Sequence, residues 1–452
     1  MRALYDSKSK TLDDRGIKEL LDSRSKYQSW LDVEAALAQA QGELEVIPMK
    51  AAEEIVQQAE VENLDFKKMD EIYQQVGHGF VPFLKVFVLA CGEETGKYIH
   101  FGATTQNIQQ TAQNLNAKKV HRKFFTFLKD ILTNLSDLAE NEADTVMAGR
   151  THGKHAIPIT YGYKVAVWIS ELLMSLQRMQ EVEKRMFTTM MGGAVGAFNS
   201  TGEIGIKVQK RVAELLDMPE MDIPSRNISS QKIEYINCLA LVANNLHKIA
   251  EEVFQTSIEE FAEVSEGFSK GTVGSSTMPH KINPKLAKGI IANAQKLYSL
   301  TSAGYASSAR PFEADSTSNM LFDGIITEAL ELMTEILMRA EELTRTLTVN
   351  RKHMLQNANI NQGIDNSESI MMYFAKRIGK DKAHELIYEL AIEAETTGEN
   401  YRDVLLKNQV VRKSFTEEEL LEMLKPENYT GLSAELAHDM AKKCKKIIAE
   451  LP

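Results

Sequence analysis

The sequence predicts an all-α protein whose middle part is a bundle of long helices. Apolar residues recur at helical spacing over about five long stretches, and the 452 residues include only ten prolines. Helices of this kind bury their apolar stripes most simply against one another. We therefore expect three helical domains: an N-terminal domain over residues 1–104, a central long-helix domain over 105–349, and a C-terminal domain over 350–452.

Composition and charge restrict the class of protein. Apolar residues make up 43% of the chain and charged residues 25%, as in ordinary globular proteins. The net charge is −11 and no run is rich in lysine or arginine, which argues against a nucleic-acid-binding surface. The N-terminus lacks an apolar signal core and no segment is apolar enough to span a membrane. Three scattered cysteines indicate neither a disulfide framework nor a zinc site. These features predict a cytoplasmic protein without membrane or nucleic-acid partners.

The N-terminal domain is predicted to contain several shorter helices. The helix near residue 30 carries apolar residues at helical spacing, and we expect them to form core: Trp30, Leu31, Val33, Ala36, Leu37 and Ala40. Farther along, His78 lies between two glycines just ahead of a helix, so little side-chain cover is expected. From its surroundings alone, an incidental loop histidine is the plainer interpretation.

The first long helix is predicted over about 108–144. Thr104 and Thr105 precede it and can cap its N-terminus, which leaves N–H groups and hydroxyls for an anion. A simple N-cap explains the same residues equally well. One apolar stripe marks the buried face of this helix: Phe124, Leu128, Ile131, Leu135 and Leu138.

Residues 148–158 interrupt the helical pattern, and their histidines and arginine suit an anion or a solvated basic loop. A glycine-rich turn at residues 192–197 lacks the spacing and the preceding strand of a dinucleotide fingerprint. A second long helix is expected to follow this interruption and to end at about Met191. Further helices are expected at the following positions: 227–268, 283–300, 321–347, 380–394, 416–424 and 433–450.

A polar segment at residues 269–284 separates two of these long helices. It contains two glycines, five serines or threonines and two prolines, so neither a continuous helix nor a central strand is possible. Its backbone N–H groups and hydroxyls, with Lys281 and Asn283, suit binding a carboxylate and stabilising extra negative charge on it. A Gly/Ser linker that happens to contain a lysine is the alternative.

Within this segment, residues 274–283 resemble the signature of the fumarase/aspartase superfamily, Gly-Ser-Ser-x-Met-Pro-x-Lys-x-Asn. Residues 99–107 and 149–156 resemble two further shared regions, in the same order. The chain is most similar to the branch that holds adenylosuccinate lyase and 3-carboxy-cis,cis-muconate cycloisomerase. The resemblance implies an L-aspartase/fumarase-like fold and a homotetramer with a twenty-helix core. It also implies active sites shared among three subunits, with no metal or organic cofactor.

The resemblance also implies roles for individual residues. Ser275 corresponds to the base that removes a proton beside a carboxylate, and its alkoxide needs nearby N–H groups and cations. His152 corresponds to the histidine that protonates the leaving group, and His78 to a histidine of adenylosuccinate lyases. The other implied positions bind the substrate or line its pocket: Thr104, Thr105, Gln106, Thr151, Met278, Lys281 and Asn283.

Two departures from the superfamily pattern concern the substrate. Lys288 stands where these lyases usually carry a glutamate that pairs with the Thr-His histidine, and a lysine cannot accept a proton from imidazole. Arginines that help bind a nucleotide phosphate are replaced at Leu4-Tyr5, at residues 228–230 and at residues 313–315. Each lost charged hydrogen bond costs about 1.5–3 kcal/mol, which argues against N-succinyl-AMP as the substrate.

These observations are compatible with three functions. The preferred hypothesis is a carbon–nitrogen lyase that releases fumarate from an N-succinyl-type substrate, a small anionic dicarboxylate. A cycloisomerase that forms a muconolactone is favoured by Lys288 and the glycine-rich turn but disfavoured by His152. An inactive structural relative is the third hypothesis, against which the complete polar segment argues.

Overall fold

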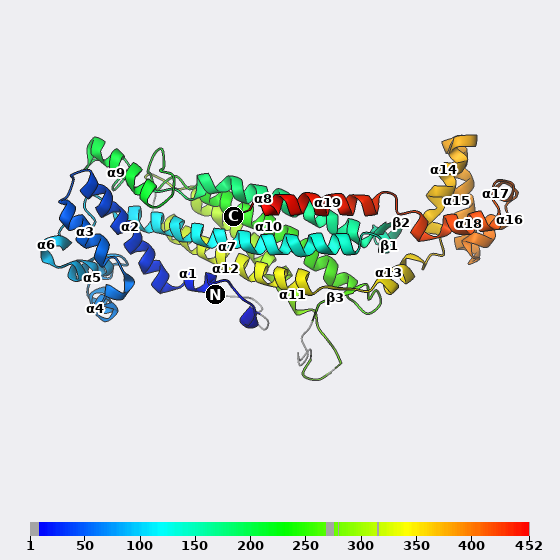
Figure 1. Cartoon of the computed structure of the whole chain (residues 1–452), viewed down its shortest axis with the longest axis horizontal. Helices are drawn as coiled ribbons and strands as arrows, with labels where there is room; N and C mark the ends of the chain where they lie inside the picture. Colours follow the sequence, from blue (N-terminus) through cyan, green and yellow to red (C-terminus); the bar gives the residue numbers. More distant parts are fainter. Residues whose placement is uncertain (1–8, 268–274, 279, 314–315, 452) are drawn as a thin grey trace. The chain divides into compact units, whose positions relative to one another are not determined.

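The computed structural model describes residues 9–267, 275–278, 280–313 and 316–451, and Figure 1 labels their elements. Apart from two small antiparallel sheets of two strands each, the regular structure is helical, which confirms the all-α prediction. The chain forms two compact units. The first comprises Met1–Phe127, Ser175–Asn244 and Ala292–Met338, and the second comprises Leu128–Met174, Asn245–Ile291 and Arg339–Pro452. None of the helices in the described ranges combines the length and hydrophobicity needed to span a membrane.

Five long helices, labelled in Figure 1, each contain residues of both units: α7 (Thr105–Asn141), α8 (Tyr161–Met186), α10 (Ser230–Thr256), α11 (Lys285–Ser308) and α12 (Ser316–Thr346). All five were predicted, although α10 ends about twelve residues before the expected position. The chain turns after Thr256, with Ala262 in the left-handed region at φ 49°. The apolar stripe of α7 is buried as expected, except that Leu138 is half-buried.

The first unit adds seven shorter helices: α1 (Ile17–Leu20), α2 (Ser23–Glu43), α3 (Met49–Gln58), α4 (Phe66–Val76), α5 (Val81–Cys91), α6 (Glu93–Gly96) and α9 (Gly202–Leu215). Asp22 caps α2 by accepting the Ser25 N–H at 2.7 Å. All six residues predicted as the core face of α2 are buried. Trp30 packs against Phe80 and Phe83, with ring centroids 4.9 and 5.2 Å away. Short 3-10 turns occupy Ser9–Thr11 and Val61–Asn63.

The second unit contains the remaining helices: α13 (Arg351–Ala358), α14 (Ser367–Ile378), α15 (Lys380–Thr397), α16 (Tyr401–Lys407), α17 (Gln409–Ser414), α18 (Glu417–Leu424) and α19 (Ser433–Ala449), with 3-10 turns at Ile364–Asn366 and Pro426–Asn428. Helix α19 packs along α7, where Lys445 Nζ lies 2.7 Å from Glu140 Oε2. Helices α15, α18 and α19 match the prediction, whereas α13, α14, α16 and α17 are short and were not predicted.

The interruption predicted at residues 148–158 is an antiparallel hairpin, which periodicity did not indicate. Strand β1 (Val146–Thr151) pairs with β2 (Lys154–Thr160), and a bulge shifts their register between Ala148 and Arg150. A second pair, β3 (Val264–Ser265) with β4 (Thr348–Val349), joins the residues after α10 to the end of α12.

Replacing Gly289 in α11 by alanine is expected to destabilise the protein. An added Cβ would lie 2.4 Å from Nε of Arg339, whose side chain is completely buried. We expect Gly289→Ala to lower the free energy of unfolding by about 1–3 kcal/mol through overpacking. Gly324 in α12 is the matched control, because an added Cβ there meets nothing within 4 Å. Gly324→Ala should raise stability by about 0.5–1 kcal/mol, and equal effects in urea denaturation would contradict the packing argument.

His121 is expected to make the stability depend on pH. It is fully buried in the first unit, with Nδ1 3.2 Å from the Tyr235 hydroxyl, and burial lowers its pKa below the ordinary 6.5. Its Nε2 lies 3.2 Å from Glu183 Oε1, but the atoms are not aligned for a hydrogen bond and Glu183 is 41% exposed. This contact therefore offsets the burial only in part.

Because the unfolded chain binds a proton at His121 below pH 6.5 more readily than the folded chain, stability should fall as the pH drops below that value. The slope should approach about 1.4 kcal/mol per pH unit. His121→Gln should reduce this slope between pH 5 and 7 in urea titrations, whereas His438→Gln, at an exposed position of α19, should keep it. An unchanged slope in His121→Gln would show that other groups control the pH dependence.

Candidate active site

His152 lies at the tip of the β1–β2 hairpin. Thr151 pairs with Lys154, so the turn has two residues, His152 at φ 53° and Gly153 at φ 72°. Two left-handed residues are the requirement of a type I′ turn, and histidine is among the non-glycine residues that tolerate this region best. The side chains of Thr151 and His152 are exposed, and His152 has no hydrogen-bond partner among the described residues.

Gly149 is required for the hairpin to close. An added Cβ would lie 2.4 Å from the carbonyl oxygen of Ile157 on the facing strand. The glycine before Arg150 therefore serves the close approach of the two strands beside the bulge. The sequence motif around His152 thus has a backbone reason as well as a chemical one.

Ser275 is held in a local turn. Its Oγ accepts hydrogen bonds from the backbone N–H groups of Thr277, at 3.3 Å, and Met278, at 3.1 Å. Two N–H donors on one hydroxyl oxygen favour negative charge on that oxygen, as an alkoxide requires. Lys281 donates its backbone N–H to the Met278 carbonyl at 3.0 Å, which continues the turn.

The other predicted residues of this polar segment differ in their exposure. Lys281 and Met278 have exposed side chains, and Asn283 is half-buried. Residues 268–274 and 279 lie outside the described residues, so part of the predicted segment 269–284 has no structural description.

Glu266 fixes the start of α11, just after the polar segment. Its carboxylate accepts the N–H groups of Leu286, at 2.9 Å, and Ala287, at 2.6 Å. Burial raises the pKa of Glu266, while these backbone donors and the charge of Lys288 act in the opposite direction. Lys288 therefore acts electrostatically on Glu266 of its own chain. No local signal could reveal this cap, because its donors lie about twenty residues away.

Helix α7 starts beside a second group of predicted residues. The expected capping by threonine hydroxyls is not found. Instead, Asn107 Oδ1 accepts the N–H groups of Thr104, at 3.0 Å, and of Gly193, at 3.2 Å. Within the described ranges the hydroxyls of Thr104 and Thr105 have no hydrogen-bond partner, so both stay available to a ligand. Gln106 exchanges amide hydrogen bonds with Gln109 and Gln110 along the same helix, at 3.2 and 3.0 Å.

A buried carboxylate holds the loop before α7. Glu34 on α2 is 2% exposed, and its oxygens meet His100 Nδ1 at 2.6 Å and the His100 N–H at 3.2 Å. His100 has φ 61°, a backbone conformation that this double contact stabilises. Gln41 Nε2 donates to the Phe101 carbonyl at 2.7 Å. Sequence reasoning missed these residues because Glu34 and His100 are 66 positions apart.

The His78 side chain binds backbone N–H groups at the start of α5, a contact that the sequence did not predict. Its Nδ1 accepts the N–H groups of Phe80, at 3.1 Å, and Val81, at 3.2 Å. A ring nitrogen that accepts must be unprotonated, so this cap favours the tautomer with the proton on the exposed Nε2. The Phe80 ring lies 5.4 Å from the ring of His100, which joins this turn to the loop before Thr104.

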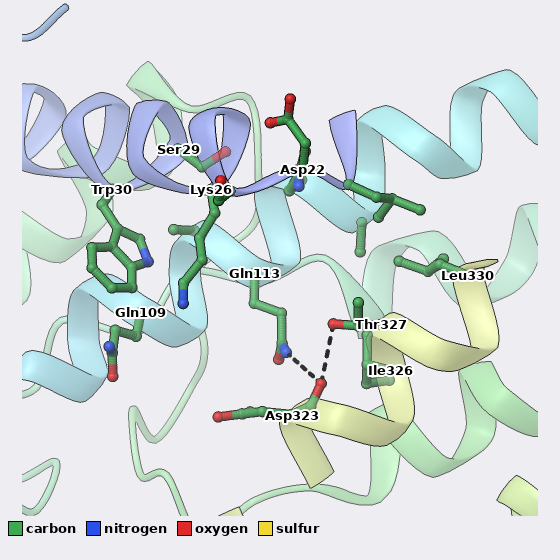
Figure 2. Close-up of a pocket in the computed structure, with 15 residues that line it drawn as sticks. Asp22, Lys26, Ser29, Trp30, Gln109, Gln113, Asp323, Ile326, Thr327 and Leu330 are labelled. Carbon is green, nitrogen blue, oxygen red and sulfur yellow. Dashed lines mark hydrogen bonds between the residues drawn. The ribbon is translucent and has the colours of Figure 1, made fainter. Parts of the chain in front are cut away.

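The first unit also has a cavity of about 370 Å³ that the sequence did not predict. Figure 2 shows it between α2, α7 and α12, with Trp30, Gln109, Gln113 and Asp323 on its walls. The Asp323 carbonyl accepts from Thr327 Oγ1 at 3.2 Å and from Gln113 Nε2 at 3.5 Å. None of the predicted site residues lines this cavity, although Gln109 is bonded to Gln106.

The predicted site residues thus fall into two groups. The first unit carries His78, Thr104, Thr105 and Gln106; the second carries Thr151, His152, Ser275, Met278, Lys281 and Asn283. Within the part of the chain that the structure describes, no group of three or more His, Cys, Asp or Glu side chains is placed to hold a metal ion.

Two substitutions separate the capping role of His78 from a chemical one. Asparagine can accept the same backbone N–H groups, whereas alanine cannot. We expect His78→Ala to lower the free energy of unfolding by about 1 kcal/mol and His78→Asn to change it little. If the imidazole acts on substrate, both variants lose turnover. Full activity of His78→Asn would restrict His78 to capping.

The chain is similar to known lyases over nearly its whole length. A family model described as "Lyase" matches residues 15–296, and one described as "Adenylosuccinate lyase C-terminus" matches residues 363–440. The adenylosuccinate lyase of Methanocaldococcus jannaschii is 36% identical, over 95% of this chain and 94% of that protein. The N-acetyl-S-(2-succino)cysteine lyase of Dickeya dadantii is 31% identical, over 89% of this chain and 88% of that protein.

The fold of a solved enzyme agrees. The 3-carboxy-cis,cis-muconate lactonizing enzyme from Pseudomonas putida superposes with a TM-score of 0.89 and 26% identity, covering 98% of this chain and 99% of that one. The expected L-aspartase/fumarase-like fold is therefore confirmed. The chain belongs to the lyase family of the fumarase/aspartase superfamily, within the branch of adenylosuccinate lyase and carboxymuconate cycloisomerase, and it is a lyase.

Proposed function

We propose that this protein is a carbon–nitrogen lyase that removes fumarate from an N-succinyl-type substrate by β-elimination. The observation that carries the proposal is the placement of Ser275, whose oxygen accepts two backbone N–H groups in a turn that also presents Lys281. Such a hydroxyl is suited to become an alkoxide and to act as a base.

The proposed reaction assigns one step to each group. Ser275 takes a proton from the carbon next to a carboxylate, and the electron pair spreads into that carboxylate as an aci-carboxylate. Lys281 and Asn283 hold this doubly charged group. The electron pair then forms the double bond of fumarate as the carbon–nitrogen bond breaks, and His152 gives the leaving amine its proton. Met278 lines the pocket.

The second carboxylate of the substrate is assigned to the start of α7. The hydroxyls of Thr104 and Thr105 and the first N–H groups of a 37-residue helix form a suitable anion site, with Gln106 beside them. Thr151 is assigned to the same substrate from the hairpin. We infer a small anionic dicarboxylate as the substrate class.

A homotetramer with active sites shared among three subunits is part of the proposal. Several long helices keep large apolar side chains exposed, which supports burial against other copies: Val167, Met174, Leu241 and Tyr305 are 39, 49, 43 and 60% exposed. The twenty-helix core, the division into domains 1–104, 105–349 and 350–452, and the cytoplasmic location stay predictions of the same proposal.

The leaving group is proposed to lack a nucleotide phosphate. Ser229, at one position where a phosphate-binding arginine is expected, is a buried neutral side chain, 5% accessible. Leu4-Tyr5 and Ala314 at the other two positions lie outside the described residues. The name of the Dickeya relative includes an S-succino group, so a sulfur leaving group belongs in the same substrate survey.

Turnover of a substrate panel tests the proposal. The panel comprises adenylosuccinate, other N-succinyl amines, an S-succino thiol and 3-carboxymuconate, with fumarate followed by ultraviolet absorbance. We expect fumarate from an N-succinyl amine, and Ser275→Ala should lower kcat by about 10²–10⁴-fold. Thr277→Ala, at an exposed side chain that the signature leaves unspecified, is the matched control and should stay within a few-fold of the parent.

Other outcomes would overturn the proposal. Fumarate only from the S-succino thiol would replace nitrogen by sulfur as the leaving atom. Consumption of 3-carboxymuconate without fumarate would favour the cycloisomerase. No turnover on any compound would favour an inactive structural relative.

A further inference from the structure

A buried carboxylate lies behind the hairpin that carries His152. Glu263 has no exposed surface, and its two oxygens accept from the guanidinium of Arg150. Arg150 Nη1 donates to Oε2 at 3.1 Å and Nη2 donates to Oε1. Asn357 Nδ2 donates to Oε1 at 2.9 Å. The carboxylate is therefore bidentate to one cation and also accepts from a neutral amide, a geometry that restricts the guanidinium strongly.

The backbone around Glu263 is fixed as well. Its N–H donates to the Thr256 carbonyl at the end of α10 at 3.0 Å, and its carbonyl accepts from the Asn350 N–H at 2.8 Å. The next residue, Val264, pairs with Val349 in the β3–β4 sheet. The backbone of Glu263 is thus held by contacts outside the hairpin, so its side chain can hold Arg150 of the hairpin in a fixed position.

Arg150 connects this anchor to the turn. It is the residue before Thr151-His152, and it pairs with His155 across the hairpin. The register shift between Ala148 and Arg150 loosens the strand pairing that would otherwise fix the tip. On the facing strand, His155 Nδ1 lies 3.3 Å from Asp365 Oδ2. Both strands are therefore held by carboxylates just behind the turn.

We propose that Glu263 is a positioning residue for His152, acting through Arg150. The proposal rests on the proposed function, in which His152 protonates the leaving group. Because proton transfer requires the imidazole within hydrogen-bond reach of the leaving atom, a displacement of about 1 Å lowers turnover about 100-fold. Substrate binding by Lys281, Asn283 and the start of α7 does not pass through Glu263.

The test compares two buried carboxylates of the second unit that each hold an arginine. Glu263→Gln removes the charge behind Arg150. Glu142→Gln is the matched control, because Glu142 accepts from Arg351 Nε at 2.8 Å and Nη2 at 3.0 Å, just before β1 rather than at the tip. We expect Glu263→Gln to lower kcat about 10–100-fold with KM within about 3-fold, and Glu142→Gln to lower stability with little change in kcat.

A second measurement does not depend on turnover. The rate at which diethyl pyrocarbonate modifies His152, read by peptide mass spectrometry and normalised to the exposed His438, reports how the ring is held. We expect this rate to change several-fold in Glu263→Gln and not in Glu142→Gln. It remains informative if no compound of the panel is turned over, so failure of the proposed function and failure of this inference are distinguishable.

Arg150→Lys covers the case in which Glu263→Gln does not fold. Lysine keeps the charge but cannot form the bidentate pair, so kcat and the modification rate should change in the same direction by a smaller factor. If kcat and the modification rate both match the parent while stability falls equally in the Glu263 and Glu142 variants, the pair is only a structural tie and the inference is wrong.

Discussion

Hydrogen bonding of carboxylates that are partly or fully shielded from water is the interaction on which the arrangement of the proposed site depends. A charge removed from water is tolerated only where hydrogen bonds and opposite charge replace its hydration. Glu34 meets this condition at His100, Glu263 at Arg150 and Asn357, and Glu266 at the first N–H groups of α11. Glu34 on α2 holds the loop before α7, Glu263 holds strand β1 next to its turn, and Glu266 holds the first turn of α11. Polar contacts therefore position the segments around the proposed site, whereas apolar packing positions the long helices.

The groups that make these structural contacts also determine which side chains stay available for chemistry. The structural hydrogen bonds of the loops are made largely by backbone groups and by Asn107, Glu34 and Glu266, so the hydroxyls of Thr104 and Thr105 and the ring of His152 keep their capacity for a ligand. Ser275 differs, because its oxygen already accepts two N–H groups. An oxygen supported in this way is better prepared for negative charge than a free hydroxyl.

Local patterns in the sequence were sufficient for the helices and insufficient for the contacts between loops. The core face of α2 and the extent of α7 follow from a 3.6-residue period that neighbouring residues express. The hairpin was not predicted. Its strand Lys154–Thr160 contains a proline, which argues against a strand, and its two-residue turn of histidine and glycine is not one of the common hairpin-turn pairs. His100 lies 66 residues from Glu34 and Arg150 lies 113 residues from Glu263, separations that no local signal spans. The candidate site residues come from the superfamily motif, whereas the distant carboxylates that hold their neighbours could not be predicted from it.

The turn at His152 has an evolutionary consequence. Its backbone lies where most side chains are strained, and glycine, asparagine, aspartate and histidine occupy such positions at the lowest cost. If the hairpin is to keep its conformation, His152 can therefore be replaced at low cost only by glycine, asparagine or aspartate. A descendant that changed its chemistry could lose the histidine yet keep the loop, and the residue found there would record the geometry of the ancestor.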